Sequence, residues 1–325
     1  MPGRIRLLTF TQLPGLRTLS AESPLATAID AITATSVVFE NHYLQRQGPE
    51  SILNFGLPGD AERHSGRETR QEFRQTTKKA KACLVLPSTN SEFDSVNLPD
   101  WLNATTLGLD STKPPALPQN QVLAALSDAD FAWLHVDTAV NATSLDIFNG
   151  AIDAIRSLST AANDTIITTA LHGHQTPDDL PFESLLWEGS IRVPLWLLHS
   201  ELPHRRIQCC TCGDDVGNTI RLVLNVEAAT QPAVASSSQT AANLLKLADT
   251  PGEVIERAIR IETASVKALR TNNFLFAMTS ETDGAESALY AKPEDVWNVN
   301  DVSAEFLEIT ERFETQLRQL SAGEL

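Results

Sequence analysis

Three short clusters of cysteine, histidine and aspartate are the places in this sequence where chemistry could occur. The densest holds Cys209, Cys210 and Cys212, with His199 and His204 just before it. Thiolates and imidazoles bind zinc, but a Cys-Cys-x-Cys spacing is not that of a zinc finger or ribbon. If this segment is a strand, Cys210 and Cys212 share one face and Cys209 lies on the other. We therefore expect buried thiols that act as small apolar side chains, with zinc binding as the alternative.

The other two clusters are His172-Gly173-His174 and Asp214-Asp215. The histidines could be the remnant of a metal site. We favour a hydrogen-bonding histidine at a strand end, followed by a glycine that allows a tight turn. The aspartates could bind a divalent cation, but Asp215 as the N-cap of the following helix is the simpler interpretation.

Apolar strands alternate with amphipathic helices through the first two thirds of the chain. We predict strands at residues 4–10, 37–39, 82–86, 131–136, 165–170 and 193–198, and helices at 25–35 and 144–158. This alternation is typical of an α/β domain around a largely parallel sheet. Between these elements, the polar segment 45–80 predicts a loop and an exposed helix at 66–79. The proline-containing segment 94–120 predicts a loop.

The last third of the chain has a different pattern. An Ala/Ser/Thr/Gln tract at 228–242 predicts a linker or mobile loop. Pro251-Gly252 predicts the start of a helix over 253–268, and small antiparallel strands are expected within 266–278 and at 287–290. A closing amphipathic helix at 303–320 is predicted to have Ser303 as its N-cap. We therefore expect an α/β core of residues 1–245 and a small C-terminal subdomain of residues 246–325 packed on it.

Composition limits the classes of partner. The 325 residues include 41 acidic and 25 basic side chains, which gives a net charge of −16. This acid excess argues against nucleic acids and anionic membranes as partners, and leaves a protein or a small molecule. No apolar run approaches the roughly 18 residues of a membrane-spanning helix. The N-terminal segment lacks the apolar stretch of a signal peptide. We therefore expect a cytoplasmic protein, or one whose leader was removed before Met1.

One run of motifs goes beyond the fold class. An Asp-x-x-x-Gly helix at 146–150 precedes a strand that ends in Leu171-His172-Gly173. The segment 188–195 then reads Glu-Gly-x-x-Arg-Val-Pro-Leu. In order and spacing these segments resemble the sulfatase family of the alkaline-phosphatase superfamily. Weaker likenesses at 29–43, 215–220, 268–274 and 289–298 extend the resemblance over nearly the whole chain. It implies an α/β sandwich with a central, mainly parallel sheet and a small C-terminal antiparallel sheet.

The residues that would attack the sulfate ester are replaced in this chain. In the family, a cysteine or serine is converted to formylglycine, whose hydrate is the nucleophile. The matching position holds Gln47, which has neither a thiol nor a hydroxyl. The activating lysine before the Glu-Gly motif is matched by Glu183, which inverts the charge and would repel an anionic ester. His135 lies inside a predicted strand, where it does not match the family's substrate-side histidine.

The metal ligands are replaced as well. The family binds Ca²⁺ or Mg²⁺, which require carboxylate oxygens. The first strand ends in Thr11 and Gln12 where the resemblance implies an Asp-Asp pair, and Leu171 stands where it implies a third aspartate. His172 remains at the fourth position. Because one imidazole among these side chains is no site for a hard cation, we expect no metal and no other cofactor.

The resemblance places a ligand cleft at the C-terminal ends of the strands. The residues expected there are Thr11, Gln12, Leu171, His172, Glu188 and Arg192, with Gln47 and Glu183 nearby. Glu188 and Arg192 are expected to brace a loop as a pair, with ligand contact as the alternative. We expect a degenerate, sulfatase-like pseudoenzyme with a binding or regulatory role. The alternative is an active sulfate- or phosphate-ester hydrolase with a rebuilt site, which could use Ser51, His172, His174 and Asp178 or Asp179.

Overall fold

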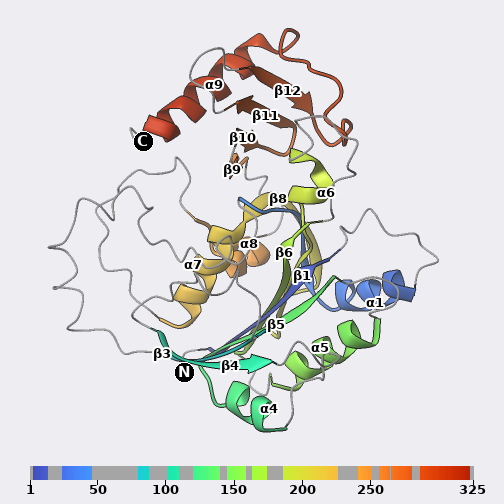
Figure 1. Cartoon of the computed structure of the whole chain (residues 1–325), viewed down its shortest axis with the longest axis vertical. Helices are drawn as coiled ribbons and strands as arrows, with labels where there is room; N and C mark the ends of the chain where they lie inside the picture. Colours follow the sequence, from blue (N-terminus) through green and yellow to red (C-terminus); the bar gives the residue numbers. More distant parts are fainter. Residues whose placement is uncertain are drawn as a thin grey trace, which may run out of the picture.

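The computed structural model describes twelve stretches of the chain. These are residues 3–13, 24–45, 80–87, 102–109, 120–139, 145–158, 163–173, 186–225, 241–250, 256–263, 265–279 and 286–322. A large sheet lies between two layers of helices, and a small sheet with one helix on its outer side sits at one end of the molecule (Figure 1). No helix in these stretches is long and apolar enough to cross a membrane.

The large sheet has eight strands in the order β4-β3-β5-β1-β6-β7-β2-β8. They are β1 (Ile5–Gln12), β2 (Val37–Tyr43), β3 (Ala80–Pro87), β4 (Leu102–Leu109), β5 (Phe131–Ala139), β6 (Thr165–His172), β7 (Leu195–His199) and β8 (Arg205–Cys212). Only β7 is antiparallel to its neighbours, β2 and β6. The central strands are apolar along their length because both faces of a parallel sheet are covered. The predicted mainly parallel sheet is thus confirmed.

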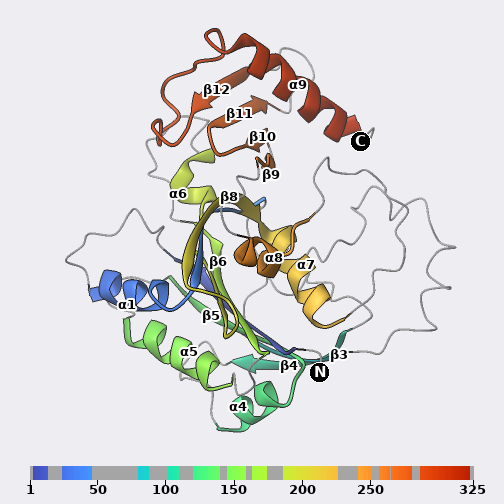
Figure 2. The ribbon, with the colours of Figure 1, turned by 180° about the vertical axis from the view of Figure 1, so that it is seen from behind.

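The helices divide between the two faces of the large sheet (Figures 1 and 2). One face carries α1 (Pro24–Thr33), α4 (Asn120–Ser127) and α5 (Leu145–Ser157), and the other carries α7 (Gly213–Val223) and α8 (Leu244–Asp249). Because successive side chains of a strand point to opposite faces of the sheet, each central strand packs against the helices on both faces. In β1, Phe10 packs on Phe148 of α5 with ring centroids 5.3 Å apart. Leu7 joins the cluster that contains Val216 of α7.

The small sheet is antiparallel, in the order β12-β11-β10-β9. Its strands are β9 (Ile259–Glu262), β10 (Val266–Arg270), β11 (Phe274–Thr279) and β12 (Ser287–Ala291). One face is covered by α9 (Leu307–Ala322) through Phe313, Leu317 and Leu320. The other packs on Tyr43, Cys210 and Cys212 at the ends of β2 and β8. One apolar cluster therefore joins the two sheets.

Three local predictions are wrong. In the described part of the helix predicted over 253–268 lies β9 instead, because buried Ile259 and Ile261 alternate with half-buried neighbours, a period of two; β10 and β11 match the strands predicted within 266–278. The predicted loop at 94–120 contains β4, an edge strand whose side chains at 103, 105 and 106 are exposed. The closing helix begins at Leu307, and Ser303 lies in a turn where its hydroxyl donates to Asp301.

Two further predictions concern residues that are not described. The predicted helix at 66–79 lies outside the described stretches, as does the predicted linker apart from its last two residues. The division of the chain at residue 245 stays a prediction.

Candidate functional site

The C-terminal ends of three neighbouring strands bring polar side chains together. Strand β1 lies between β5 and β6, with Thr9 beside His135 of β5 and Gln12 beside His172 of β6. Thr11 follows on the same face as Thr9, and Asp137 on the same face as His135. We call Thr11, Gln12, His135, Asp137 and His172 the strand-end site. It contains three of the cleft residues predicted from the sequence.

A chain of hydrogen bonds runs through one side of this site. The indole N–H of Trp133 donates to the Thr9 hydroxyl over 2.8 Å. That hydroxyl lies 2.9 Å from Nδ1 of His135, and the other ring nitrogen, Nε2, lies 3.3 Å from the Thr11 hydroxyl. The Thr11 hydroxyl donates to Oδ1 of Asp137 over 2.9 Å. We call these five residues the hydrogen-bond chain.

The two ends of the hydrogen-bond chain fix its direction. Trp133 can only donate, and Oδ1 of Asp137 accepts from the Thr11 hydroxyl. The single hydrogen of Thr11 goes to Asp137, so Thr11 must accept from Nε2–H of His135. Nδ1 of His135 then accepts from Thr9. Burial, and next the nearby His172, lower the pKa of His135 to about 3, which keeps the ring neutral with one N–H.

Two of the predicted cleft residues lie outside the hydrogen-bond chain. Leu171 is fully buried in the apolar cluster on the α7 side of the sheet. Gln12 uses its amide to donate to the backbone carbonyl of Gly173 over 2.7 Å. Gln47 and Glu183 lie outside the described residues.

Gly173 allows a close approach between β6 and the short helix α6 (Glu188–Ile191). A Cβ atom at Gly173 would lie 2.3 Å from the carbonyl oxygen of Ser190 and 2.4 Å from that of Gly189. Any side chain there would have to move α6, because real Cβ atoms do not approach backbone this closely. The glycine therefore positions α6 against the strand ends.

Glu188, at the start of α6, is the centre of a buried charged cluster between the two sheets. Its carboxylate accepts from Nε of Arg270 over 2.7 Å and from the Tyr43 hydroxyl over 3.4 Å. Nζ of Lys292 lies 3.9 Å away. Burial alone would raise the pKa of Glu188, but the charges of Arg270 and Lys292 outweigh it and hold that pKa below its ordinary value. Burial also lowers the pKa of Lys292 to about 8.

The prediction that Glu188 and Arg192 brace a loop as a pair is therefore wrong, because the two side chains bind different partners. The Glu188 carboxylate pairs with the small sheet, whereas Nε of Arg192 donates to the backbone carbonyl of Glu40 over 2.7 Å. Both residues brace the structure, but through different neighbours. The sequence could have indicated Arg270, because it lies in the 268–274 segment of the resemblance.

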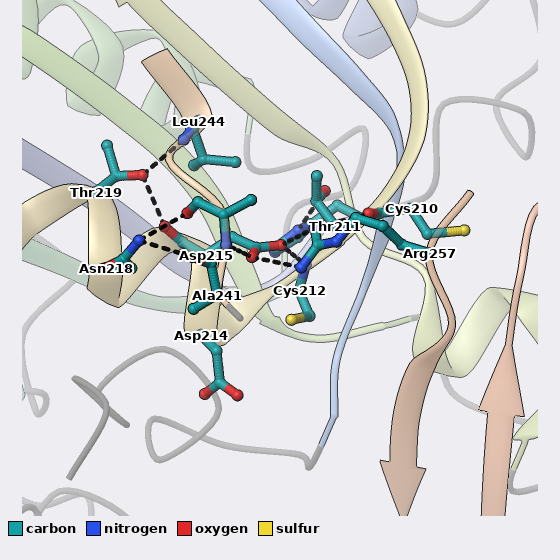
Figure 3. Close-up of polar contacts among 12 residues, drawn as sticks. Cys210, Thr211, Cys212, Asp214, Asp215, Asn218, Thr219, Ala241, Leu244 and Arg257 are labelled. Atoms are coloured by element: carbon teal, nitrogen blue, oxygen red, sulfur yellow. Dashed lines mark hydrogen bonds and ion pairs between the residues drawn. The ribbon is translucent and has the colours of Figure 1, made fainter. Parts of the chain in front are cut away.

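A second buried ion pair holds α7 and the segment before β9. Figure 3 shows Asp215 bound by both terminal nitrogens of Arg257, at 2.7 and 2.8 Å. Asp215 also accepts from the backbone N–H groups of Cys212 and Ala242. The prediction that Asp215 is the N-cap is wrong, because the helix begins at Gly213 with Cys212 as its N-cap and Asp215 is its third residue. Its carboxylate is saturated by these contacts.

The cysteines behave as strand alternation predicts. Cys209 packs in the cluster under α7, whereas Cys210 and Cys212 pack in the cluster that faces the small sheet. All three are buried and free. Burial raises the pKa of Cys210 to about 12, so this thiol is not ionised near neutrality.

The donor set of the strand-end site does not fit a hard cation. Ca²⁺ and Mg²⁺ require several oxygen ligands, mostly carboxylates. The described part of the site has a single carboxylate, that of Asp137, and it already accepts from Thr11. No group of three or more His, Cys, Asp or Glu side chains suited to a metal ion occurs among the described residues.

Sequence comparison finds no relative, since no family model matches and no curated protein matches at a significant level. Solved structures do match over nearly the whole chain. A phosphonate monoester hydrolase of Agrobacterium radiobacter aligns over 99% of this chain and 96% of its own, with a TM-score of 0.60 and 12% identity. A Bacteroides fragilis protein described as a sulfatase aligns over 99% and 96%, with a TM-score of 0.65 and 12% identity.

A third structure is that of a protein in complex with its substrate D-glucosamine-2-N,6-O-disulfate. It aligns over 100% of this chain and 98% of its own, with a TM-score of 0.66 and 10% identity. This chain has the sulfatase fold. Identities this low establish the fold alone, and the chemistry of the strand-end site has to be argued from its own residues.

Proposed function

We propose that this chain is a sulfatase-like protein that does not hydrolyse sulfate esters and serves a binding or regulatory role. The composition of the strand-end site carries the proposal. Where the resemblance implies three metal-binding carboxylates, this chain has a threonine in the hydrogen-bond chain, a glutamine bonded to Gly173, and a leucine in the apolar core. Metal-assisted ester hydrolysis needs a cation that polarises the ester oxygens. These three side chains supply no charge to hold one.

The local charges also favour this proposal. A sulfate ester is an anion, and the described site presents Asp137 to it. Two cations beside α6, Arg270 and Lys292, are buried and face Glu188. We propose a chain that works without Ca²⁺ or Mg²⁺ and whose partner is a protein or small molecule. Its cytoplasmic location stays a prediction.

The test is a thermal melt of the full chain with Ca²⁺, with Mg²⁺ and with a chelator. We expect the three melting temperatures to agree. An ion present at 100 times its dissociation constant would stabilise the native state by about 2.7 kcal/mol, so a clear rise with either ion would contradict the proposal. Turnover of aryl sulfate or aryl phosphate after metal loading would also contradict it and would favour the rebuilt hydrolase site.

A positive control is available in the chain. The double variant Thr11→Asp/Gln12→Asp restores two carboxylates at the half-buried end of β1. If the fold can still hold a cation, this variant should gain Ca²⁺-dependent stability that the native chain lacks. The matched charge control is Thr315→Asp/Gln319→Asp on the surface of α9, where no metal response is expected.

A further inference from the structure

The exposed large apolar side chains of this protein are concentrated in one short segment. Five of the six in the described residues lie between 296 and 307, the sixth being Leu222 on α7. The five are Val296, Trp297, Val299, Phe306 and Leu307, and we call them the apolar segment surface. Val299 is 81% exposed and Trp297 is 53% exposed. Scattered exposed apolar residues are ordinary, but a concentration of them marks an interaction site.

The segment connects β12 to α9 and runs along the edge of the small sheet, at the end of α9 away from the C-terminus (Figure 2). Its backbone is fixed. The Asp295 carboxylate accepts from the N–H groups of Val299 and Asn300, and the N–H of Val302 donates to Leu289 of β12. The buried Asn298 donates to the Leu186 carbonyl over 3.3 Å. A partner would therefore meet a preorganised surface, which lowers the entropy cost of binding.

Trp297 is held in place by a second tryptophan. Its ring stacks on that of Trp187, which precedes α6, with centroids 5.2 Å apart and planes 8° apart. The stack covers part of the Trp297 ring and leaves about half of the side chain to solvent. Tryptophan is the residue that most often dominates interface energetics, because it buries a large rigid area at small entropic cost.

Unpaired acids flank this surface. Glu294 precedes Val296, and Glu305 and Glu308 flank Phe306 and Leu307; all three are exposed. None of their carboxylates forms an ion pair with a residue in the described stretches. The surface thus offers apolar anchors within a negative field. A partner with apolar side chains among lysines and arginines complements it, whereas a second copy of this chain, with its charge of −16, would be repelled.

We propose that the apolar segment surface docks a protein segment that carries aliphatic or aromatic side chains between basic residues. This docking role is a specific form of the proposed binding role and rests on that proposal. Its test measures peptide affinity, which is independent of metal response and turnover, so the two proposals can fail separately.

The probe is a synthetic amphipathic peptide of leucine and lysine at helical spacing, with a leucine/glutamate peptide of the same pattern as its counterpart. Fluorescence anisotropy measures binding of each to the full chain. We expect the basic peptide to bind and the acidic one not to bind. Val299→Ser and Trp297→Ser should each lower the affinity for the basic peptide about tenfold or more. The charge variant Glu305→Lys/Glu308→Lys should also lower this affinity. The affinity of the native chain for the basic peptide should fall with added salt.

The matched control is Leu222→Ser, which removes the exposed apolar side chain outside the surface and should leave affinity unchanged. Val299→Ser keeps the test valid if Trp297→Ser alters the fold, because Val299 is the most exposed of the five. Equal loss in Leu222→Ser and Val299→Ser would overturn the proposal. So would equal binding of the two peptides, or dimerisation of the native chain that Val299→Ser abolishes.

Discussion

His135 is neutral and oriented because of the residues on either side of it. Trp133 donates at one end of the hydrogen-bond chain and Asp137 accepts at the other, so only the Nε2–H tautomer satisfies every bond. The sequence placed His135 inside a strand but could not predict this arrangement. It depends on the register between β1 and β5, whose residues are more than 120 positions apart along the chain.

Removing the middle of the hydrogen-bond chain should be costly. Thr11→Val loses the bonds to both His135 and Asp137, and leaves Nε2–H of a buried ring without its acceptor. We expect a loss of about 1–3 kcal/mol in the free energy of unfolding and a mixed His135 tautomer by nitrogen NMR. Asp137→Asn is the control, because its amide oxygen can still accept from Thr11. Equal losses in the two variants would argue against the assigned direction.

Two buried histidines should make the protein sensitive to mild acid. Burial lowers the pKa of His42 to about 4 and that of His135 to about 3, against 6.5 for the ordinary group. The unfolded chain therefore takes up protons first, and stability is lost as pH falls from about 6.5 towards 4. The slope should be about 1.4 kcal/mol per pH unit for each histidine. Urea denaturation at several pH values measures it.

The control for this slope is His135→Gln, which should reduce it by about half between pH 6.5 and 5, where only His42 would still contribute. A stability that stays flat over this range in the native chain would contradict the burial of both imidazoles.

At the scale of the elements, α6 connects the strand ends to the small sheet. Gly173 admits its backbone, and Glu188 in its first turn carries the charge that Arg270 and Lys292 require. The sequence predicted the importance of Glu188 and Arg192 from a motif. It could not assign their partners, because Arg270 lies 82 residues away from Glu188 in a sheet whose first strand the sequence pattern predicted as helix.

Neutralising Glu188 should therefore destabilise the protein strongly. Glu188→Gln leaves two buried cations without a carboxylate, for which we expect a loss of about 3–5 kcal/mol in the free energy of unfolding. The matched control is Glu40→Gln, since Glu40 pairs at 2.8 Å with Arg206, whose side chain is 55% exposed. This control should lose less than about 1 kcal/mol. Similar losses in both variants would show that burial does not set the strength of the Glu188 cluster.

At the scale of the whole molecule, the sequence predicted the layered α/β fold because hydrophobic periodicity depends on burial alone. The large sheet and its covering helices follow from apolar runs such as 131–136 and 165–170. Strand β9 was missed because Pro251-Gly252 is a sequence signal for a helix start, and the strand is only four residues long. The two buried ion pairs, Glu188–Arg270 and Asp215–Arg257, depend on tertiary contacts, so no local sequence pattern predicts them.

The two sheets should unfold together. One apolar cluster contains Tyr43, Cys210 and Cys212 from the core with Ile259 and Leu275 from the small sheet, and both buried ion pairs join the core to residues after 256. We expect a single calorimetric transition whose calorimetric and van't Hoff enthalpies agree. Two resolved transitions would show that residues near 245 separate independent folding units.

The position of Leu171 has a consequence for anyone who wishes to design a catalyst on this scaffold. An aspartate there would bring an ionised group into an apolar cluster before any cation was present to neutralise it, and the chain would lose stability at that step. Thr11 and Gln12, which are half-buried, tolerate charge more easily. A workable order of substitutions therefore installs the two carboxylates of β1 first and the core aspartate last, with the cation supplied throughout. The order in which the residues change matters as much as which residues change.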